Sequence, residues 1–456
     1  MVFSSLLFIF RFLPVFFITY ILSPIKYRNL ILLIGSLLFY SFGEPKYFII
    51  MIASILVDYF VGINIENNFD NRKKCKYFLL ISILFNMGSL FFFKYFNFFI
   101  NNINMILGFS INELNITLPL GISFYSFQTL SYSIDIYRGE VKAERNIIDF
   151  GAFVSSFPQL IAGPIVKYSD IDKEIKNRKI ELTNIEEGIK IFIMGLAKKV
   201  LLANNIGMLW TEIYSKNISD ITTPLAWLGV LAFSFQIYFD FSGYSSMAIG
   251  LGKMLGFTFP KNFDFPYISK SIREFWRRWH ITLSSWLKEY IYIPLGGNRV
   301  GRRRYFFNLL ILWFFTGFWH GAEYTFIIWG LYFFVLVYIE SRFIKNFLER
   351  HKIFSRIYTI FFLLIGWCIF AIDNIKLLCL YLKKMFTFNY SIEWIYYIKN
   401  YFIILLICIL CSTPLILKIY NKLNDSIKII IMFALFILSI AYLVDSTYNP
   451  FLYFRF

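Results

Sequence analysis

Charged residues are scarce in this sequence. Of its 456 residues, 16% are Asp, Glu, Lys or Arg, whereas 58% are hydrophobic. A soluble protein of this length could not bury so much apolar surface, so the composition excludes a chain of two or three soluble domains. We therefore expect an all-α polytopic membrane protein with about ten or eleven transmembrane helices and further re-entrant or interfacial helices. The simplest interpretation is one membrane domain over residues 1–456.

Cysteine and histidine are also rare: the sequence contains five cysteines and three histidines. Cys408 and Cys411 form a single CxxC pair inside an apolar run, without histidines at zinc spacing. We interpret all five cysteines as packing residues. The sequence therefore predicts neither a disulfide framework nor a metal site.

Several nucleotide and catalytic motifs are missing from the sequence. It contains no GxSxG elbow, no Walker A lysine loop and no dinucleotide fingerprint. These absences argue against a serine hydrolase of that type and against ATP or NAD chemistry. The polar breaks are not duplicated in two halves, as they often are in transporters with inverted repeats.

The formal charge of +17 comes from 45 Lys and Arg against 28 Asp and Glu. In a membrane protein, such an excess first indicates cytoplasmic loops, and without a soluble domain it does not indicate nucleic-acid binding. A third reading is an anionic thioester carrier that approaches the cytoplasmic face. The N-terminus lacks a basic n-region and a cleavage site, so we expect a retained helix. If the basic loops at 26–28 and 72–76 are cytoplasmic and the short Gly-Glu-Pro turn between the spans is outside, the N-terminus lies outside.

Apolar runs alternate with polar stretches along the chain. We predict spans at about 2–22, 30–42, 47–65, 77–93, 224–256, 324–340, 357–372, 401–417 and 427–444, a helix at 186–202, and a weaker segment near 375–388. Residues 119–138, which include Gln128, are apolar yet dense in hydroxyl and amide groups. They must line a polar cavity or pack at a helix interface rich in Ser and Thr. Prolines and a glycine at 157–164 predict a broken membrane helix.

An acidic side chain interrupts the apolar run at 224–256. Asp240 should need a cationic partner at this depth, and we expect an Arg or Lys from residues 273–304 to supply it. The pair would be either structural or part of a site.

Residues 273–323 hold two of the three histidines, His280 and His320, preceded directly by Trp279 and Trp319. The periodicity of 273–288 predicts one amphipathic helix, and His320 ends an apolar run just before Gly321, where a helix could stop. Without metal ligands or a nucleophile nearby, the histidines are either packing residues or a general base that acts on a substrate hydroxyl. In the second case, the acyl group would arrive preactivated as a thioester.

Residues 275–286, 292–298 and 318–322 resemble the membrane-bound O-acyltransferase superfamily, and within it the alginate O-acetyltransferase AlgI branch. The resemblance extends to residues 121–138, 158–164, 240–244 and 449–456. It implies a ring of tilted helices around a thin central pore, with a catalytic core at about 119–345. In this reading His320 is the essential catalytic histidine and His280 helps to orient or stabilise the reacting groups. Trp279, Trp319, Asp240 and Gln128 are predicted to bind substrate.

The resemblance also implies an activity at the cell membrane. An acetyl group would pass from a cytoplasmic thioester donor, acetyl-CoA or a carrier-bound thioester, to an extracytoplasmic polysaccharide such as an alginate-like polymer, peptidoglycan or another envelope glycan. A secreted or membrane-anchored partner acyltransferase would complete delivery, and no tightly bound cofactor is expected. The alternatives are D-alanyl transfer to teichoic acids, a non-enzymatic transporter or flippase, and a scaffold with structural histidines.

Overall fold

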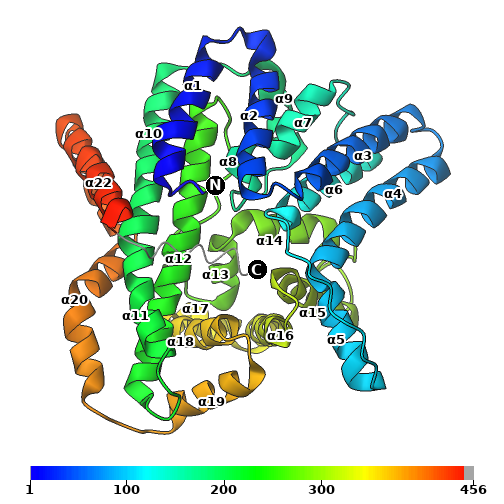
Figure 1. Ribbon diagram of the computed structural model, residues 1–456. Coiled ribbons are helices and arrows are strands. Elements are labelled where there is room, and N and C mark those ends of the chain that lie inside the picture. Colours follow the sequence, from blue (N-terminus) through cyan, green and yellow to red (C-terminus); the bar gives the residue numbers. More distant parts are fainter. Residues whose placement is uncertain (1, 446–456) are drawn as a thin grey trace. The chain divides into compact units, whose positions relative to one another are not determined.

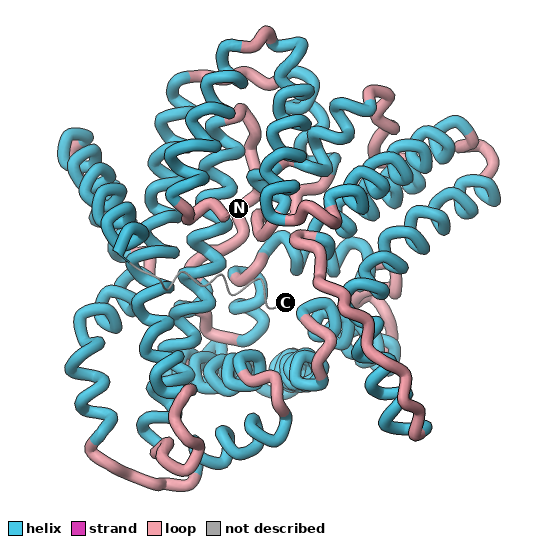
Figure 2. The backbone as a smooth tube through the Cα atoms, in the orientation of Figure 1, coloured by secondary structure: helices cyan, strands magenta, loops and turns pink. Residues whose placement is uncertain are grey.

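The computed structural model describes residues 2–445. The described chain divides into two compact units: unit 1 comprises residues 2–192 and 244–260, and unit 2 comprises residues 193–243 and 261–445. Figure 1 labels their helices. The regular elements of the described residues are all helices (Figure 2), which confirms the all-α prediction. One membrane domain over the whole chain stays a prediction. The stretch 449–456, which contributed to the family resemblance, lies outside the described residues.

Most of unit 1 consists of the N-terminal helices. Its elements are η1 (Phe8–Phe12), α1 (Leu13–Leu22), η2 (Ile25–Tyr27), α2 (Arg28–Gly43), α3 (Phe48–Asn67), α4 (Arg72–Leu90), η3 (Phe91–Tyr95), α5 (Phe96–Leu107), α6 (Ile122–Arg138), α7 (Ile147–Ser155), α8 (Phe157–Leu160), α9 (Tyr168–Asn177) and most of α10 (Leu182–Ala197). The predicted break at 157–164 is confirmed, because α8 is a single short turn that ends at Leu160.

Unit 2 contains the rest of the helices. After the end of α10, these are η4 (Lys198–Asn204), α11 (Asn205–Tyr214), the larger part of α12 (Thr223–Met254), η5 (Pro266–Ile268), α13 (Ile272–Arg278), α14 (Ile281–Leu287), η6 (Lys288–Tyr292), α15 (Arg302–His320), α16 (Tyr324–Ile339), η7 (Glu340–Ile344), α17 (Lys345–Arg350), α18 (Lys352–Ala371), α19 (Ile375–Phe386), α20 (Glu393–Cys411), α21 (Leu415–Lys422) and α22 (Asp425–Asp445).

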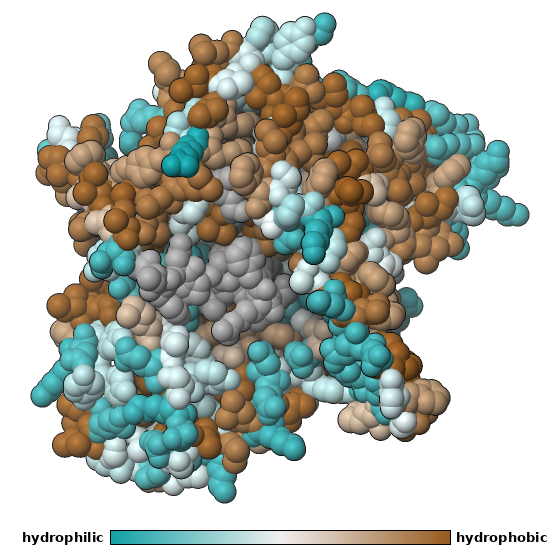
Figure 3. All heavy atoms as spheres, in the orientation of Figure 1, coloured by the Kyte–Doolittle hydropathy of each residue, from teal (hydrophilic) through white to brown (hydrophobic). Residues whose placement is uncertain are grey.

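Nine helical segments of the described residues are long and apolar enough to cross a membrane, and a shorter apolar segment covers Phe8–Leu22. Figure 3 shows hydrophobic side chains over much of the visible surface, while hydrophilic ones gather at the loop between α3 and α4. That surface could not face water, so the protein is a multi-pass membrane protein, as predicted. The predicted spans near 30–42, 47–65 and 224–256 correspond to α2, α3 and α12.

A buried carboxylate joins three helices of unit 1. Asp58 on α3 is fully buried and accepts hydrogen bonds from Ser82 on α4 and, at 2.8 Å, from Ser133 on α6. The Asn86 amide on α4 donates to the second carboxylate oxygen of Asp58 at 2.7 Å, and the Thr129 hydroxyl on α6 donates to the side-chain oxygen Oδ1 of Asn86 at 3.0 Å. Lipid offers no hydrogen bonds, so these groups satisfy one another. Part of the hydroxyl-rich 119–138 stretch is therefore a helix interface.

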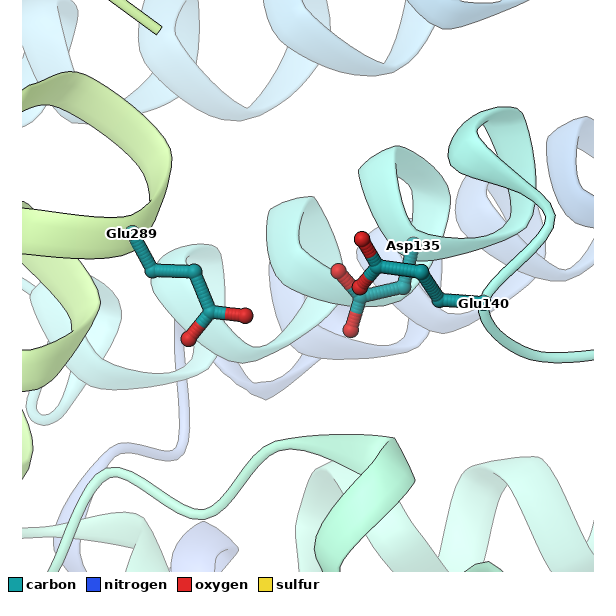
Figure 4. Close-up of side chains that lie close together, drawn as sticks. All are labelled: Asp135, Glu140 and Glu289. Carbon is teal, nitrogen blue, oxygen red and sulfur yellow. The ribbon is translucent and has the colours of Figure 1, made fainter. Parts of the chain in front are cut away.

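The end of α6 is closed by a glycine. Gly139 has φ +79°, which a residue with a side chain rarely adopts, and Glu140 N–H donates to Asp135 C=O at 2.9 Å. This turn folds Glu140 back over the last turn of α6, where its carboxylate oxygen lies within 4.8 Å of that of Asp135 (Figure 4). The arrangement ends the helix sharply at Arg138.

Two glycines let α15 and α16 approach closely in unit 2. A Cβ atom built on Gly317 would lie 3.1 Å from the Cα atom of Gly330, and it would also meet the carbonyl oxygen of Phe326. Because all of these atoms belong to the backbone, no flexible side chain could move away to make room for the Cβ atom. This close pair of helices carries His320 at the end of α15.

We predict that Gly317→Ala destabilises the protein by about 1–3 kcal/mol, because the added methyl group forces α15 and α16 apart. The measurement is thermal unfolding of the purified protein in detergent. Gly88→Ala in α4 is the control, since its Cβ would meet no atom within 4 Å and alanine favours a helix. Equal melting temperatures for Gly317→Ala and wild type would contradict the packing described here.

Candidate active site

The predicted helix over 273–288 is wrong in one respect, because it breaks at Trp279 and His280. α13 ends at Arg278, Trp279 is extended, and His280 has φ 44° and ψ 54°, in the left-handed region. A neighbouring loop takes over the hydrogen bonds at the break: Asp264 N–H donates to Arg278 C=O at 2.9 Å, and Ile281 N–H donates to Asn262 C=O at 3.0 Å. Histidine rarely adopts this conformation without compensation, so the loop holds His280 in a fixed orientation.

Asn262 also determines which nitrogen of His280 carries the proton. The Asn262 side-chain oxygen accepts from Thr282 N–H at 3.3 Å and from the Thr282 hydroxyl at 3.0 Å, so this atom is an acceptor. It lies 3.2 Å from Nδ1 of His280, which must therefore donate. The proton sits on Nδ1, and Nε2 presents a lone pair. Among the described residues, this buried Nε2 has no hydrogen-bond partner.

Apolar surroundings keep the His280 ring neutral. It is 1% exposed, and Phe241 stands edge-on to it with ring centroids 4.6 Å apart. His280 lies outside the nine candidate spans of the described chain, and burial lowers its pKa to about 3. The ring is therefore an uncharged hydrogen-bond acceptor at neutral pH.

His320 is the last residue of α15, and the extended Gly321 ends the helix there, as predicted. The imidazole is 7% exposed. Trp329 of α16 and Phe370 of α18 stand nearly perpendicular to it, with ring centroids at 5.0 Å and 5.2 Å. Three helices of unit 2 thus fix the orientation of this ring.

The Trp319 ring lies close to both histidines. Its ring centroid lies 6.1 Å from that of His280 and 5.0 Å from that of His320. Trp279 instead packs within an aromatic cluster, with its ring centroid 4.8 Å from that of Trp367 and 5.1 Å from that of Phe263. Both histidines lie near Trp319, whereas a shared site for them and substrate binding by either tryptophan stay predictions.

Asp240 is paired, but with a residue from an unexpected element. Its carboxylate lies 2.6 Å from Nζ of Lys199 in η4, and both side chains are almost completely buried. Lys199 also donates to the side-chain oxygen Oδ1 of Asn204 at 2.9 Å. The expectation of a partner from 273–304 is therefore corrected. The pair anchors α12, whose next residue, Phe241, contacts His280.

Gln128 belongs to α6 in unit 1, whereas the other predicted site residues belong to unit 2. It is completely buried, and neither atom of its amide has a hydrogen-bond partner among the described residues. Such an amide needs a partner from outside the described chain, such as water or substrate. Sequence reasoning missed Asn262, Trp329 and Phe370, for which no motif or charge pattern gave a signal.

Residues 138–382 match the membrane-bound O-acyltransferase family. The chain belongs to this family, and it is a membrane O-acyltransferase.

The similar proteins include O-acetyltransferases of two glycans. The chain is 41% identical over 394 residues to the probable alginate O-acetylase AlgI of Pseudomonas putida, covering 85% of this chain and 81% of that protein. It is 37% identical over 425 residues to the peptidoglycan O-acetyltransferase of Helicobacter pylori, covering 85% and 80%. The chain is 31% identical over 230 residues to the teichoic acid D-alanyltransferase of Streptococcus thermophilus, covering 47% of this chain and 54% of that protein.

We predict that Lys199→Met destabilises the protein by about 3–5 kcal/mol, because it leaves the Asp240 carboxylate buried without its cation. Adding Asp240→Asn should recover part of the loss. Lys216→Met is the matched control, since Lys216 and Glu393 form a more exposed pair worth less than about 1 kcal/mol. The stabilities of wild type and the three variants are measured by thermal unfolding in detergent. Similar losses of stability in Lys199→Met and Lys216→Met would contradict the buried pair.

We predict that His280 stays neutral and protonated on Nδ1 from pH 5 to pH 8, because its pKa is lowered to about 3. Nitrogen NMR of protein labelled at its three histidines measures this, and the signals missing from His280→Gln identify the residue. The exposed His351 provides the comparison within the same spectrum. A His280 signal that titrates in this range, or a proton on Nε2, would contradict the hydrogen-bond assignment.

Proposed function

We propose that this protein takes an acetyl group from a thioester donor on the cytoplasmic side and passes it to a hydroxyl for O-acetylation of an extracytoplasmic polysaccharide. The observation that carries the proposal is the pair of buried imidazoles around Trp319. Two relatives named for O-acetylation of alginate and peptidoglycan match 85% of this chain, which favours acetyl as the acyl group and a glycan as the final acceptor.

His320 acts as the general base in this proposal. It takes the proton of the acceptor hydroxyl while the hydroxyl oxygen attacks the thioester carbonyl. The new C–O bond forms, the C–S bond breaks, and the proton passes to the leaving thiolate. Transfer from a thioester to an ester needs no further activation, so one proton acceptor and correct positioning suffice. Trp329 and Phe370 support this role by fixing the ring.

His280 has a different role, because a neutral ring with a pKa of about 3 is a weak base. Its Nε2 lone pair is suited to accept a hydrogen bond from the acceptor hydroxyl and hold it in place. We expect His280→Ala to impair transfer strongly without abolishing proton removal by His320.

The donor in this proposal is acetyl-CoA or a carrier-bound acetyl thioester. A thioester is already activated, so a site with one base is suited to accept its acyl group. We also propose that a secreted or membrane-anchored acyltransferase completes delivery to the polymer. D-alanyl transfer is the second candidate, supported by the match to a teichoic acid D-alanyltransferase over about half of this chain.

We predict that His320→Ala abolishes acetylation of the envelope polysaccharide, because the hydroxyl proton loses its acceptor. The measurement is mass spectrometry of the polymer from cells that make wild-type or variant protein at equal membrane levels. His351→Ala removes a histidine from the exposed start of α18 and is the control. Unchanged acetyl content in His320→Ala would contradict the role of His320, and an added alanyl mass instead of acetyl would favour the second candidate.

A further inference from the structure

A second feature of unit 2 is a cavity of about 770 Å³ beside α13 and α15. Five cationic side chains line it, and its lining contains no Asp or Glu: Arg273, Arg277, Lys288, Arg342 and Lys345. Excess positive charge is ordinary in cytoplasmic loops of membrane proteins. Here, however, the charges come from four separate elements, α13, η6, η7 and α17, and converge on one concave surface.

The charges in the cavity are not neutralised by the protein. Within the described part of the chain, Arg273, Arg277, Lys288 and Arg342 form no ion pair, and Lys345 reaches only the exposed Glu349 at 3.9 Å. Arg278, also on α13, contrasts with them, since it pairs with Asp264 at 2.9 Å and with Glu274 at 3.0 Å. Arg278, outside the cavity, thus has two carboxylate partners, whereas the three cavity arginines form no ion pair within the described residues.

An adjacent, smaller cavity differs from this one because carboxylates also line it. The neighbour has a volume of about 450 Å³ and shares Arg273, Arg277 and Lys345, yet Glu274, Glu340 and Glu349 also line it. Its carboxylates would repel an anion. The larger cavity presents only cations and neutral groups, so it is the one suited to a multiply charged anion.

The neutral part of the lining indicates what the anion is attached to. Leu309, Leu312 and Trp313 of α15 provide an apolar wall, and Tyr305 lies under the Arg342 guanidinium at 5.3 Å. Trp276 also lines the cavity and has a buried indole N–H without an acceptor in the described chain. A ligand that combines phosphate groups with an apolar or aromatic portion matches these surroundings, whereas a small inorganic ion would leave the wall uncovered.

We propose that this cavity is a binding site for an organic phosphate. Arg273, Arg277, Lys288, Arg342 and Lys345 bind its phosphate oxygens, and the α15 wall packs against the remainder. Two kinds of ligand carry such a phosphate group: a soluble nucleotide phosphate and the headgroup of an anionic phospholipid. If the phosphate belongs to the acyl donor, the donor would lie near His320, because Trp276 packs 5.4 Å from Trp329, which contacts His320 at 5.0 Å. Phosphate binding itself does not depend on the proposed acetyl transfer.

The test measures binding directly, with the full protein in nanodiscs. Adenosine 3′,5′-bisphosphate is the soluble probe, and the lipid probe is phosphatidylglycerol retained by protein from mixed phosphatidylglycerol and phosphatidylcholine membranes. The variant Arg277→Gln with Lys288→Gln removes two cavity charges. The control, Arg302→Gln with Arg303→Gln, removes two exposed charges at the start of α15 that do not line the cavity.

We expect the cavity variant to weaken binding of one probe by at least about tenfold, as loss of charge-assisted hydrogen bonds predicts, and the control to bind like wild type. Loss confined to the bisphosphate identifies a nucleotide source, and loss confined to phosphatidylglycerol identifies a lipid source. The proposal is overturned if wild type binds neither probe, or if the cavity variant and the control behave alike. Unchanged melting temperatures show that both variants are folded. Acetyl transfer is a separate readout, so loss of activity in His320→Ala does not affect this result.

Discussion

Every polar group inside this protein must find its partner within the protein or in a ligand, because lipid offers none. In unit 1, the Asp58 carboxylate is satisfied by hydroxyl and amide groups from two other helices. In unit 2, Asp240 and Lys199 satisfy one another. Nε2 of His280 and the amide of Gln128 are among the buried groups of the described residues that have no hydrogen-bond partner. A group that is buried without a partner is where a substrate or water belongs.

In unit 2, the two histidines and the cationic cavity lie on connected elements. α13 presents Arg273 and Arg277 to the cationic cavity, and the helix break that follows it places His280 against Phe241 and Asn262. Glu340 accepts hydrogen bonds from the first two N–H groups of α13, at 2.6 Å and 3.0 Å, and so fixes the start of this helix. One short helix thus relates the anion-binding surface to the histidine site.

Composition and hydropathy were sufficient to predict a multi-pass helical membrane protein and the ends of helices such as α15. The break at His280 could not be predicted, because hydrophobic periodicity is the same on both sides of it. Its cause is the loop with Asn262 and Asp264, which is local only in the folded chain. The prediction of the Asp240 partner was wrong because the sequence contains several cations that could pair with it. Only the packing of the folded chain brings Lys199 close to Asp240. The roles of the predicted site residues stay predictions.

The central claim is that His280 offers the Nε2 lone pair to the reacting hydroxyl. The most direct measurement compares initial rates of acetyl transfer by His280→Gln and His280→Asn in proteoliposomes. The Gln side-chain oxygen reaches the region of Nε2, whereas the Asn oxygen ends near Nδ1, which faces Asn262. The account predicts that Gln retains a substantial part of the wild-type rate and that Asn does not. Equal rates for the two variants, or a faster Asn variant, would contradict it.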